Sequence, residues 1–162
     1  MVDKITFFYA MEYINLFGNR ILKVWITPNY IFAAKVKGLT SEITGYAFID
    51  ENFVIDPVFR EDPKAYVNPK EENKYHSFFF DKLTPKQFMK LGVENFVLTK
   101  KSVSNIFFTP KKKWGMGNYP HQGRIFIETS KEEFNKKKKR EFIIIGNQDV
   151  EQIMKALDGF II

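Results

Sequence analysis

Hydrophobic and polar side chains alternate most regularly over residues 21–38, ILKVWITPNYIFAAKVKG. Apolar residues occupy every second position on both sides of the pair Pro28-Asn29. An alternation with period two is typical of β-strands, and proline followed by asparagine suits the two central positions of a tight turn. The pattern predicts a β-hairpin whose turn lies at Pro28 and Asn29.

Other short apolar runs bounded by turn residues predict further strands. Residues 4–17 are apolar, but Glu12, Asn15 and Asn19 would share one stripe of a helix, so this run fits either a short helix or a strand. Residues 43–49 and 52–59 are expected to pair with each other. The remaining predicted strands are residues 95–99, 102–108, 123–129 and 140–146. The chain is therefore expected to be rich in antiparallel β-structure.

A short helix is predicted from Thr84 to Gly92. Thr84 suits the N-cap, Pro85 suits the first helical position, and Gln87 completes a capping box. Gly92 is a typical residue just beyond a helix C-terminus. The helix follows residues 56–77, a polar stretch with three of the seven prolines, which we interpret as a long excursion from the sheet.

A second helix is predicted from Asp149 to Gly159. Asp149 suits the N-cap, with Gln152 three residues further on. The apolar residues of this segment fall on one helical face: Val150, Ile153, Met154 and Leu157. Such a face needs an apolar surface to pack against. We therefore expect an α+β fold that is mainly β, a bent antiparallel sheet or partly open barrel with this amphipathic helix at one side.

Length and composition favour one domain over residues 1–162. The chain has 162 residues, of which 44% are hydrophobic and 18 are Phe, enough to bury a substantial core. It has no Cys, which excludes a disulfide framework and a thiolate metal site. The N-terminal apolar run is too short and too interrupted for a membrane span and lacks a signal-peptide pattern. We expect a cytoplasmic protein without a transmembrane segment.

The order of elements from about 94 to 158 resembles the C-terminal half of a bacterial pleckstrin-homology-like (PH-like) or GRAM-like domain. The segments that carry the resemblance are the strands SVSNIFF, GRIFIET and REFIIIG and the helix DVEQIMKAL. The hairpin at 21–38 would supply the opening strands. The resemblance implies a seven-stranded bent sheet with a C-terminal helix, and an insertion at about 56–92. It implies binding or scaffolding rather than catalysis, and some members bind phosphoinositides or other membrane lipids.

The positive charge is concentrated in one part of the chain. The net charge is +6, residues 1–70 are neutral, and residues 100–140 carry twelve Lys or Arg against three Glu, a local charge of +9. A local field of this size favours an anionic partner. The basic residues are 21 Lys and only 4 Arg, although arginine is preferred for specific phosphate or base recognition.

Two basic clusters are candidate contact sites. The predicted anion or membrane contact comprises Lys136, Lys137, Lys138, Lys139 and Arg140. In PH-like domains the corresponding loop lies at the open end, where headgroup ligands dock. The secondary candidate comprises Lys111, Lys112, Lys113, Trp114 and Arg124. Consecutive loops of a meander emerge at opposite ends, so the clusters are not expected to form one patch. Trp114 is expected to fold back onto the sheet, with insertion at an interface as the alternative.

The expected function is therefore a non-catalytic binding or scaffolding module for a protein partner or an anionic lipid surface, peripheral to a membrane in the second case. One alternative is an OB-like protein that binds single-stranded nucleic acid, although the strand aromatics Phe107, Phe108 and Phe126 are expected in the core. A second alternative is a small enzyme that uses His76 or His121, the only two histidines, with a carboxylate. No metal or cofactor is expected.

Overall fold

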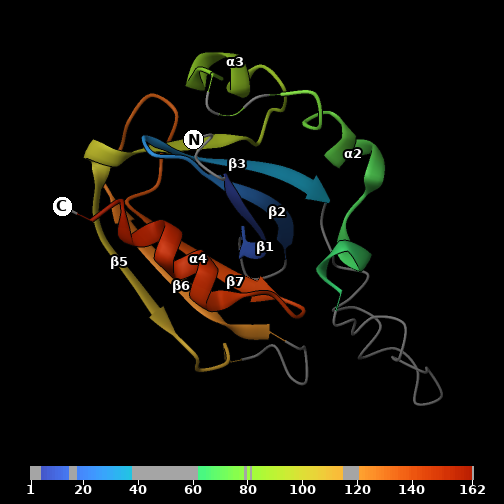
Figure 1. Ribbon diagram of the computed structural model, residues 1–162, viewed down its shortest axis with the longest axis vertical. Coiled ribbons are helices and arrows are strands. Elements are labelled where there is room, and N and C mark those ends of the chain that lie inside the picture. Colours follow the sequence, from blue (N-terminus) through green and yellow to red (C-terminus); the bar gives the residue numbers. More distant parts are fainter. Residues whose placement is uncertain are drawn as a thin grey trace.

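The computed structural model describes residues 5–14, 18–37, 62–78, 80, 82–114 and 121–161 (Figure 1). The predicted strands at 43–49 and 52–59 lie outside these residues. Within the described part of the chain there are seven strands, β1 (Thr6–Tyr13), β2 (Asn19–Ile26), β3 (Tyr30–Lys37), β4 (Phe96–Thr99), β5 (Val103–Thr109), β6 (His121–Thr129) and β7 (Lys139–Ile145). The helices are α2 (Pro69–Asn73), α3 (Pro85–Met89) and α4 (Val150–Asp158), with 3₁₀ turns η2 (Pro63–Tyr66) and η3 (Lys100–Ser102).

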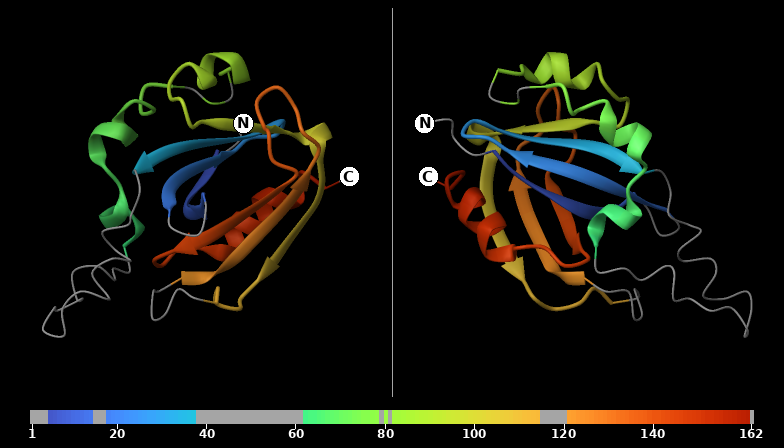
Figure 2. Two further views of the ribbon diagram at one scale, coloured as in Figure 1. Left: turned by 180° about the vertical axis from the view of Figure 1, so that it is seen from behind. Right: turned by 45° about the vertical axis from the view of Figure 1, so that its right-hand side comes forward.

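The strands form one curled antiparallel sheet in the order β4-β3-β2-β1-β7-β6-β5. Figure 2 shows the sheet bent into a half-barrel, with α4 on its inner side. This confirms the expected class, a mainly β fold with a bent antiparallel sheet and a C-terminal helix. Strands that follow one another in sequence are neighbours in the sheet, except β4 and β5, which lie at its two edges, and β1 also pairs with β7.

The N-terminal run forms a strand, so the helical interpretation of residues 4–17 is wrong. Residues Thr6 to Tyr13 pair with β2 along their full length, and Ala10 and Met11 also pair with β7. Pairing with two strands outweighs a weak helical stripe, because tertiary context overrides local propensity. The predicted hairpin is confirmed, with Thr27 and Tyr30 hydrogen-bonded across the turn.

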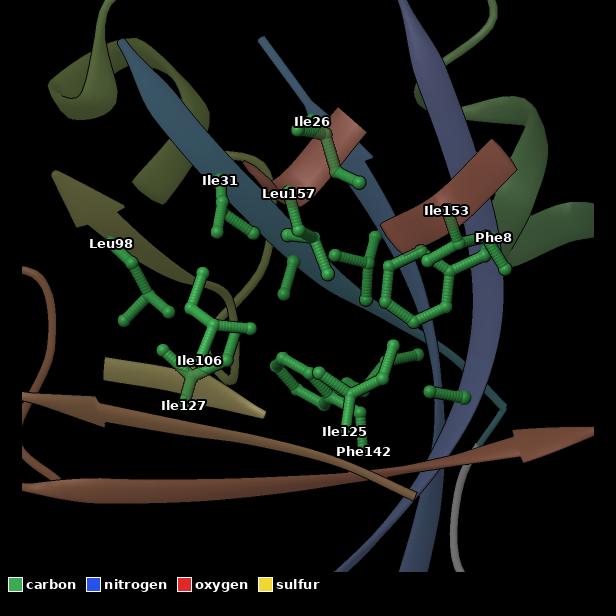
Figure 3. Packing of buried hydrophobic residues seen from close by; sticks show 14 of the residues in the cluster. Phe8, Ile26, Ile31, Leu98, Ile106, Ile125, Ile127, Phe142, Ile153 and Leu157 are labelled. Carbon is green, nitrogen blue, oxygen red and sulfur yellow. The ribbon is translucent and has the colours of Figure 1, made fainter. Parts of the chain in front are cut away.

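The main core lies between the inner face of the sheet and α4 (Figure 3). Ile153 and Leu157 of α4 are buried among sheet residues, including Phe8, Ile125 and Phe142. Asp149 caps α4 by accepting a hydrogen bond from the amide of Gln152, as predicted. Strand β6 alternates strictly, since its odd-numbered residues are buried and its even-numbered residues are not.

A second core lies on the outer side of β2, β3 and β4, where Figure 1 shows α2 and α3 running along the sheet. Trp25, Phe32 and Val97 from the strands pack against aromatic residues of the segment that follows β3, Tyr75, Phe80 and Phe88. All eight residues of β2 are buried in consequence. Helix α3 starts with the predicted capping box of Thr84 and Gln87. The described part of the segment 56–92 is thus a covering layer for this half of the sheet.

Candidate functional site

The outward side chains of β5, β6 and the start of β7 form a face that we term the basic face, after the lysine-rich loops at its two ends: Phe107, Arg124, Phe126, Glu128, Lys139 and Glu141. Phe107 and Phe126 are directly opposed on β5 and β6 and their rings stack at 4.8 Å. Phe107 is 39% exposed. The expectation that both belong to the core is wrong, because the alternation of β5 and β6 turns them outward. Phe108, the third residue of that group, packs against the core as expected.

Cations from both predicted clusters lie close to Phe126. The Arg124 guanidinium carbon is 5.3 Å, and the Lys139 ammonium 5.1 Å, from the centre of its ring. The two loops do emerge at opposite ends of β6, as expected for a meander. The expectation of two separate patches nevertheless needs correction, since the inner members of both clusters meet over one phenylalanine.

The start of β6 contains an irregularity beside Arg124. The register shifts between His121 and Arg124, and Gly123 has a φ of 133°, a conformation that favours glycine. A Cβ atom at Gly123 would lie 2.5 Å from the carbonyl oxygen of Thr109 and 2.6 Å from the ring of Phe108. Gly123 is therefore required both for the backbone conformation and for the close approach of β5.

The described part of the loop after β5, residues 110–114, is fastened to the sheet; we term it loop 110–114. Arg124 Nε donates to the carbonyl of Lys111 at 3.2 Å, and the amide of Lys113 donates to His121 Nε2 at 3.0 Å. Lys113 Nζ and Arg124 Nη1 both pair with Glu141, at 2.9 and 3.2 Å. Three sheet residues thus position this short loop and hold Lys113 against the sheet.

The outer residues of this loop face solvent. Lys111 and Lys112 are exposed, and Trp114 is 96% exposed. The expectation that Trp114 folds back onto the sheet is wrong. The secondary cluster of the sequence therefore divides into two groups: Lys113 and Arg124 pair with Glu141, while Lys111, Lys112 and Trp114 are free to meet a partner.

The loop after β6 is held by buried polar groups at both ends of its lysine run. Asn135 is 1% exposed and its amide nitrogen donates to Thr129 Oγ1 and to the carbonyl of Lys137, each at 2.9 Å. Its Oδ1 accepts from Arg140 Nη2 at 3.0 Å. The carbonyl of Phe134 accepts from the amide of Val97, which ties this loop to β4. These hydrogen bonds hold the loop in a fixed position relative to the sheet.

Arg140 is buried and therefore does not belong to the predicted contact surface. It is 4% exposed, its Nη1 lies 3.0 Å from Glu12 Oε2, and its guanidinium lies 3.5 Å above the centre of the Phe96 ring. Arg20 binds the same carboxylate at 2.6 Å. Burial alone would raise the pKa of Glu12, but the charges of Arg140 and Arg20 hold it below its usual value. Arg140 is therefore held inside the protein by Glu12 and Phe96.

The lysines of this run are more exposed than that buried cluster, although Lys137 pairs with its Glu12. Lys138 and Lys139 are exposed, and Lys136 donates to the carbonyl of Glu132 while remaining exposed. Lys137 is 3.6 Å from Glu12 and its side chain is 43% exposed. The predicted cluster thus keeps its four lysines as candidates for an anionic partner and loses its arginine.

The two histidines lie in different settings. His121 is buried and accepts a backbone hydrogen bond, and its pKa is lowered by burial and by the charge of Lys112. His76 is largely exposed and lies 3.5 Å from Glu72. Glu72 accepts a hydrogen bond from the Tyr9 hydroxyl and pairs with the buried Lys23 at 3.4 Å. These contacts attach α2 to the outer side of β1 and β2.

A groove of about 580 Å³ runs between α2 and the connection from α3 to β4. Its lining includes Lys35, Tyr75, Leu91 and Asn95, and neither histidine lines it. Within the described residues, no group of three or more His, Asp or Glu side chains is arranged to hold a metal ion. No helix among these residues combines the length and apolar character needed to cross a bilayer.

Comparisons of the chain with protein-family models, curated proteins and solved structures found no match. Function is therefore inferred from the geometry and charges of the described residues. Sequence reasoning found the exposed lysines but missed the Phe107–Phe126 pair and the buried position of Arg140. The alternation of β6 could have located Phe126, since Ile125 and Ile127 flank it on the opposite face.

Proposed function

We propose that this protein is a non-catalytic binding module with a PH-like fold that acts at the periphery of an anionic membrane, on its cytoplasmic side. Its contact surface comprises the basic face and the lysines of the two loops that flank it. The strand order and the position of α4 support the PH-like fold, and they are compatible with the resemblance at residues 94–158.

One observation carries the proposal. The segment with a local charge of +9 folds so that its arginines pair within the protein while most of its lysines face solvent. Arg124 and Arg140 each bind a glutamate, whereas Lys111, Lys112, Lys136, Lys138 and Lys139 are exposed. Lysine is a compact, hydrated charge that suits a fluid anionic surface better than a fixed bidentate site.

Sedimentation with phosphatidylcholine vesicles, with and without phosphatidylserine, tests this proposal. We expect binding only to the anionic vesicles, with an affinity that falls as salt is added. Each lysine near the surface contributes about 1 kcal/mol. The double substitution Lys136→Gln and Lys138→Gln should therefore weaken binding by more than about tenfold. The control is Lys82→Gln with Lys86→Gln, two exposed lysines beside the covered outer face.

Equal binding to both vesicle types, or an equal loss for the control and for the Lys136 and Lys138 double variant, would overturn the proposal. The control matters because both pairs remove the same charge from the whole protein. A difference between the two variants in vesicle binding would therefore show that the contact is local to the lysines of loop 130–138.

The stacked phenylalanines favour single-stranded nucleic acid as a second candidate partner. Aromatic side chains on a strand face, flanked by cations such as Lys139, can stack with successive bases. Fluorescence anisotropy with single-stranded oligonucleotides over a salt series tests this candidate. Salt-dependent binding that is weakened by Phe107→Ala would support it, and no binding at low salt would eliminate it.

A further inference from the structure

Loop 110–114 presents a tryptophan from a fixed base. The contacts of Arg124, His121 and Glu141 hold the backbone of Lys111, the backbone of Lys113 and the side chain of Lys113. Beyond these contacts, Trp114 is 96% exposed. The protein thus uses a buried histidine and an arginine to position a loop whose largest apolar side chain has no cover among the described residues.

The neighbours of Trp114 determine which partner suits it. Lys111 and Lys112 are exposed on the same short loop, and Lys113 lies just behind them. Tryptophan prefers the boundary between water and hydrocarbon, where its ring is apolar and its N–H remains hydrated. Lysines beside it would lie at the level of anionic headgroups. A protein groove that received Trp114 would also have to accommodate these lysines.

Loops 110–114 and 130–138 differ in whether they expose an aromatic side chain. In loop 130–138 the aromatic residue is Phe134, which is half-buried and whose backbone carbonyl is bonded to β4. The lysine run 136–139 is therefore suited to charge attraction alone. Loop 110–114 combines charge with an exposed aromatic side chain, as interfacial anchors do.

We propose that Trp114 enters the interfacial layer of an anionic bilayer while Lys111 and Lys112 contact the lipid headgroups. This inference rests on the proposed function and adds the anchor and its orientation: the outer face of β5 and β6 lies along the membrane, with Trp114 inserted at one end. The lysines of loop 130–138, at the other end of β6, then contact headgroups without insertion.

Tryptophan fluorescence tests this inference directly, because the chain has only two tryptophans and Trp25 is 5% exposed. Phosphatidylserine-containing vesicles should shift the emission of Trp114 to shorter wavelength and leave that of Trp25 unchanged. Brominated lipids should quench the shifted emission. Trp114→Phe serves as the matched control, since it retains an aromatic ring and leaves only the Trp25 signal.

Affinity provides the second measurement. Trp114→Ala should weaken sedimentation with anionic vesicles about tenfold, as expected for the loss of one large apolar side chain from an interface. Lys111→Gln with Lys112→Gln should weaken it by more than about tenfold. These residues are exposed, so their substitution leaves the core intact, and an unchanged melting temperature verifies this point.

The outcomes separate this inference from the function on which it rests. Binding to anionic vesicles without a shift or quenching of Trp114 overturns the anchor and leaves the membrane function standing. Absence of binding to anionic vesicles overturns both. A shift produced by single-stranded oligonucleotides but not by vesicles overturns both in favour of a nucleic-acid partner.

Discussion

The two halves of the curled sheet have opposite outer faces. The outer face of β2, β3 and β4 is covered by residues 62–78, 80 and 82–92, and its aromatic residues pack edge to face around Phe88. The outer face of β5, β6 and the start of β7 has no covering helix among the described residues, and its two phenylalanines stack only with each other. Among the described residues, one outer face is thus covered by the chain itself and the other is not.

The charged side chains of the two faces differ in the same way. On the covered side, Lys23 is buried and is matched by Glu72. On the uncovered side, Glu141 pairs with two cations while the loop lysines remain exposed. We propose that the covered face contributes mainly to stability and the basic face mainly to binding. The predictions below test this division by placing the same kind of substitution on each face.

The largest expected difference is between two phenylalanines. Phe88 is completely buried in the covered cluster, so Phe88→Ala should lower the free energy of unfolding by about 3–5 kcal/mol. Phe107→Ala removes an exposed ring from one stacked pair and should cost about 1 kcal/mol or less. Urea unfolding of both variants checks the prediction. Similar losses would show that the basic face is a structural surface like the covered one.

Two glutamates give the next comparison. Glu72 accepts from Tyr9 and pairs with the buried Lys23, so Glu72→Ala should cost about 3 kcal/mol by leaving that ammonium without its partner. Glu141 is partly exposed, and Glu141→Ala should cost about 1 kcal/mol or less. Thermal unfolding compares them. If Glu141→Ala proved the more destabilising, the proposed division between the faces would fail.

Acid should affect the two sides in different pH ranges. Burial and Lys112 lower the pKa of His121, so the unfolded chain binds that proton more readily than the folded protein. The contribution of His121 to stability is therefore complete above pH of about 6.5 and declines as the pH falls below that value. The loss of stability on protonation of His121 should be smaller than the loss caused by Glu72→Ala. It should mainly affect loop 110–114, whose Lys113 amide donates to His121.

His121→Gln tests this effect because it retains a hydrogen-bond acceptor and does not titrate. The difference in unfolding free energy between pH 7 and pH 5 should be smaller in the variant than in the native chain. Glu72 behaves differently: burial opposes its ionisation, but the Tyr9 hydroxyl and Lys23 lower its pKa. Its contribution is present above the usual carboxyl range and is lost at more acidic pH. An identical pH dependence in the variant and the native chain would exclude His121 as the responsible group.

The periodic elements could be predicted from sequence. The hairpin at Pro28-Asn29 and helix α4 each carried both a pattern and a boundary signal, and both are confirmed. The N-terminal strand could not be separated from a helix, because its pairing with β2 and β7 is non-local. Both faces of β2 are covered, and this too depends on residues 40 or more positions away in sequence. Trp25, on the strand face that the alternation predicted to be polar, was a signal for this burial.

The candidate site was predictable only in part. Lysine runs show where charge lies along the chain, but they do not reveal which side chains turn inward. Arg140 ends such a run and is buried because Glu12, far away in sequence, requires a partner. In a chain with 21 Lys and 4 Arg, the presence of arginine was itself a signal for a paired, bidentate role. Trp114 could not be placed, since its exposure depends on how the loop is fastened to His121 and Arg124.

Amide hydrogen exchange in the presence and absence of phosphatidylserine vesicles tests the central claim most directly, because it reports on both faces in one experiment. We predict slower exchange with vesicles in residues 107–114 and at the flanking lysines of 136–139, and no change in residues 62–78 and 82–92. Slower exchange confined to the covering segment, with the basic face unchanged, would contradict the assignment of the binding surface.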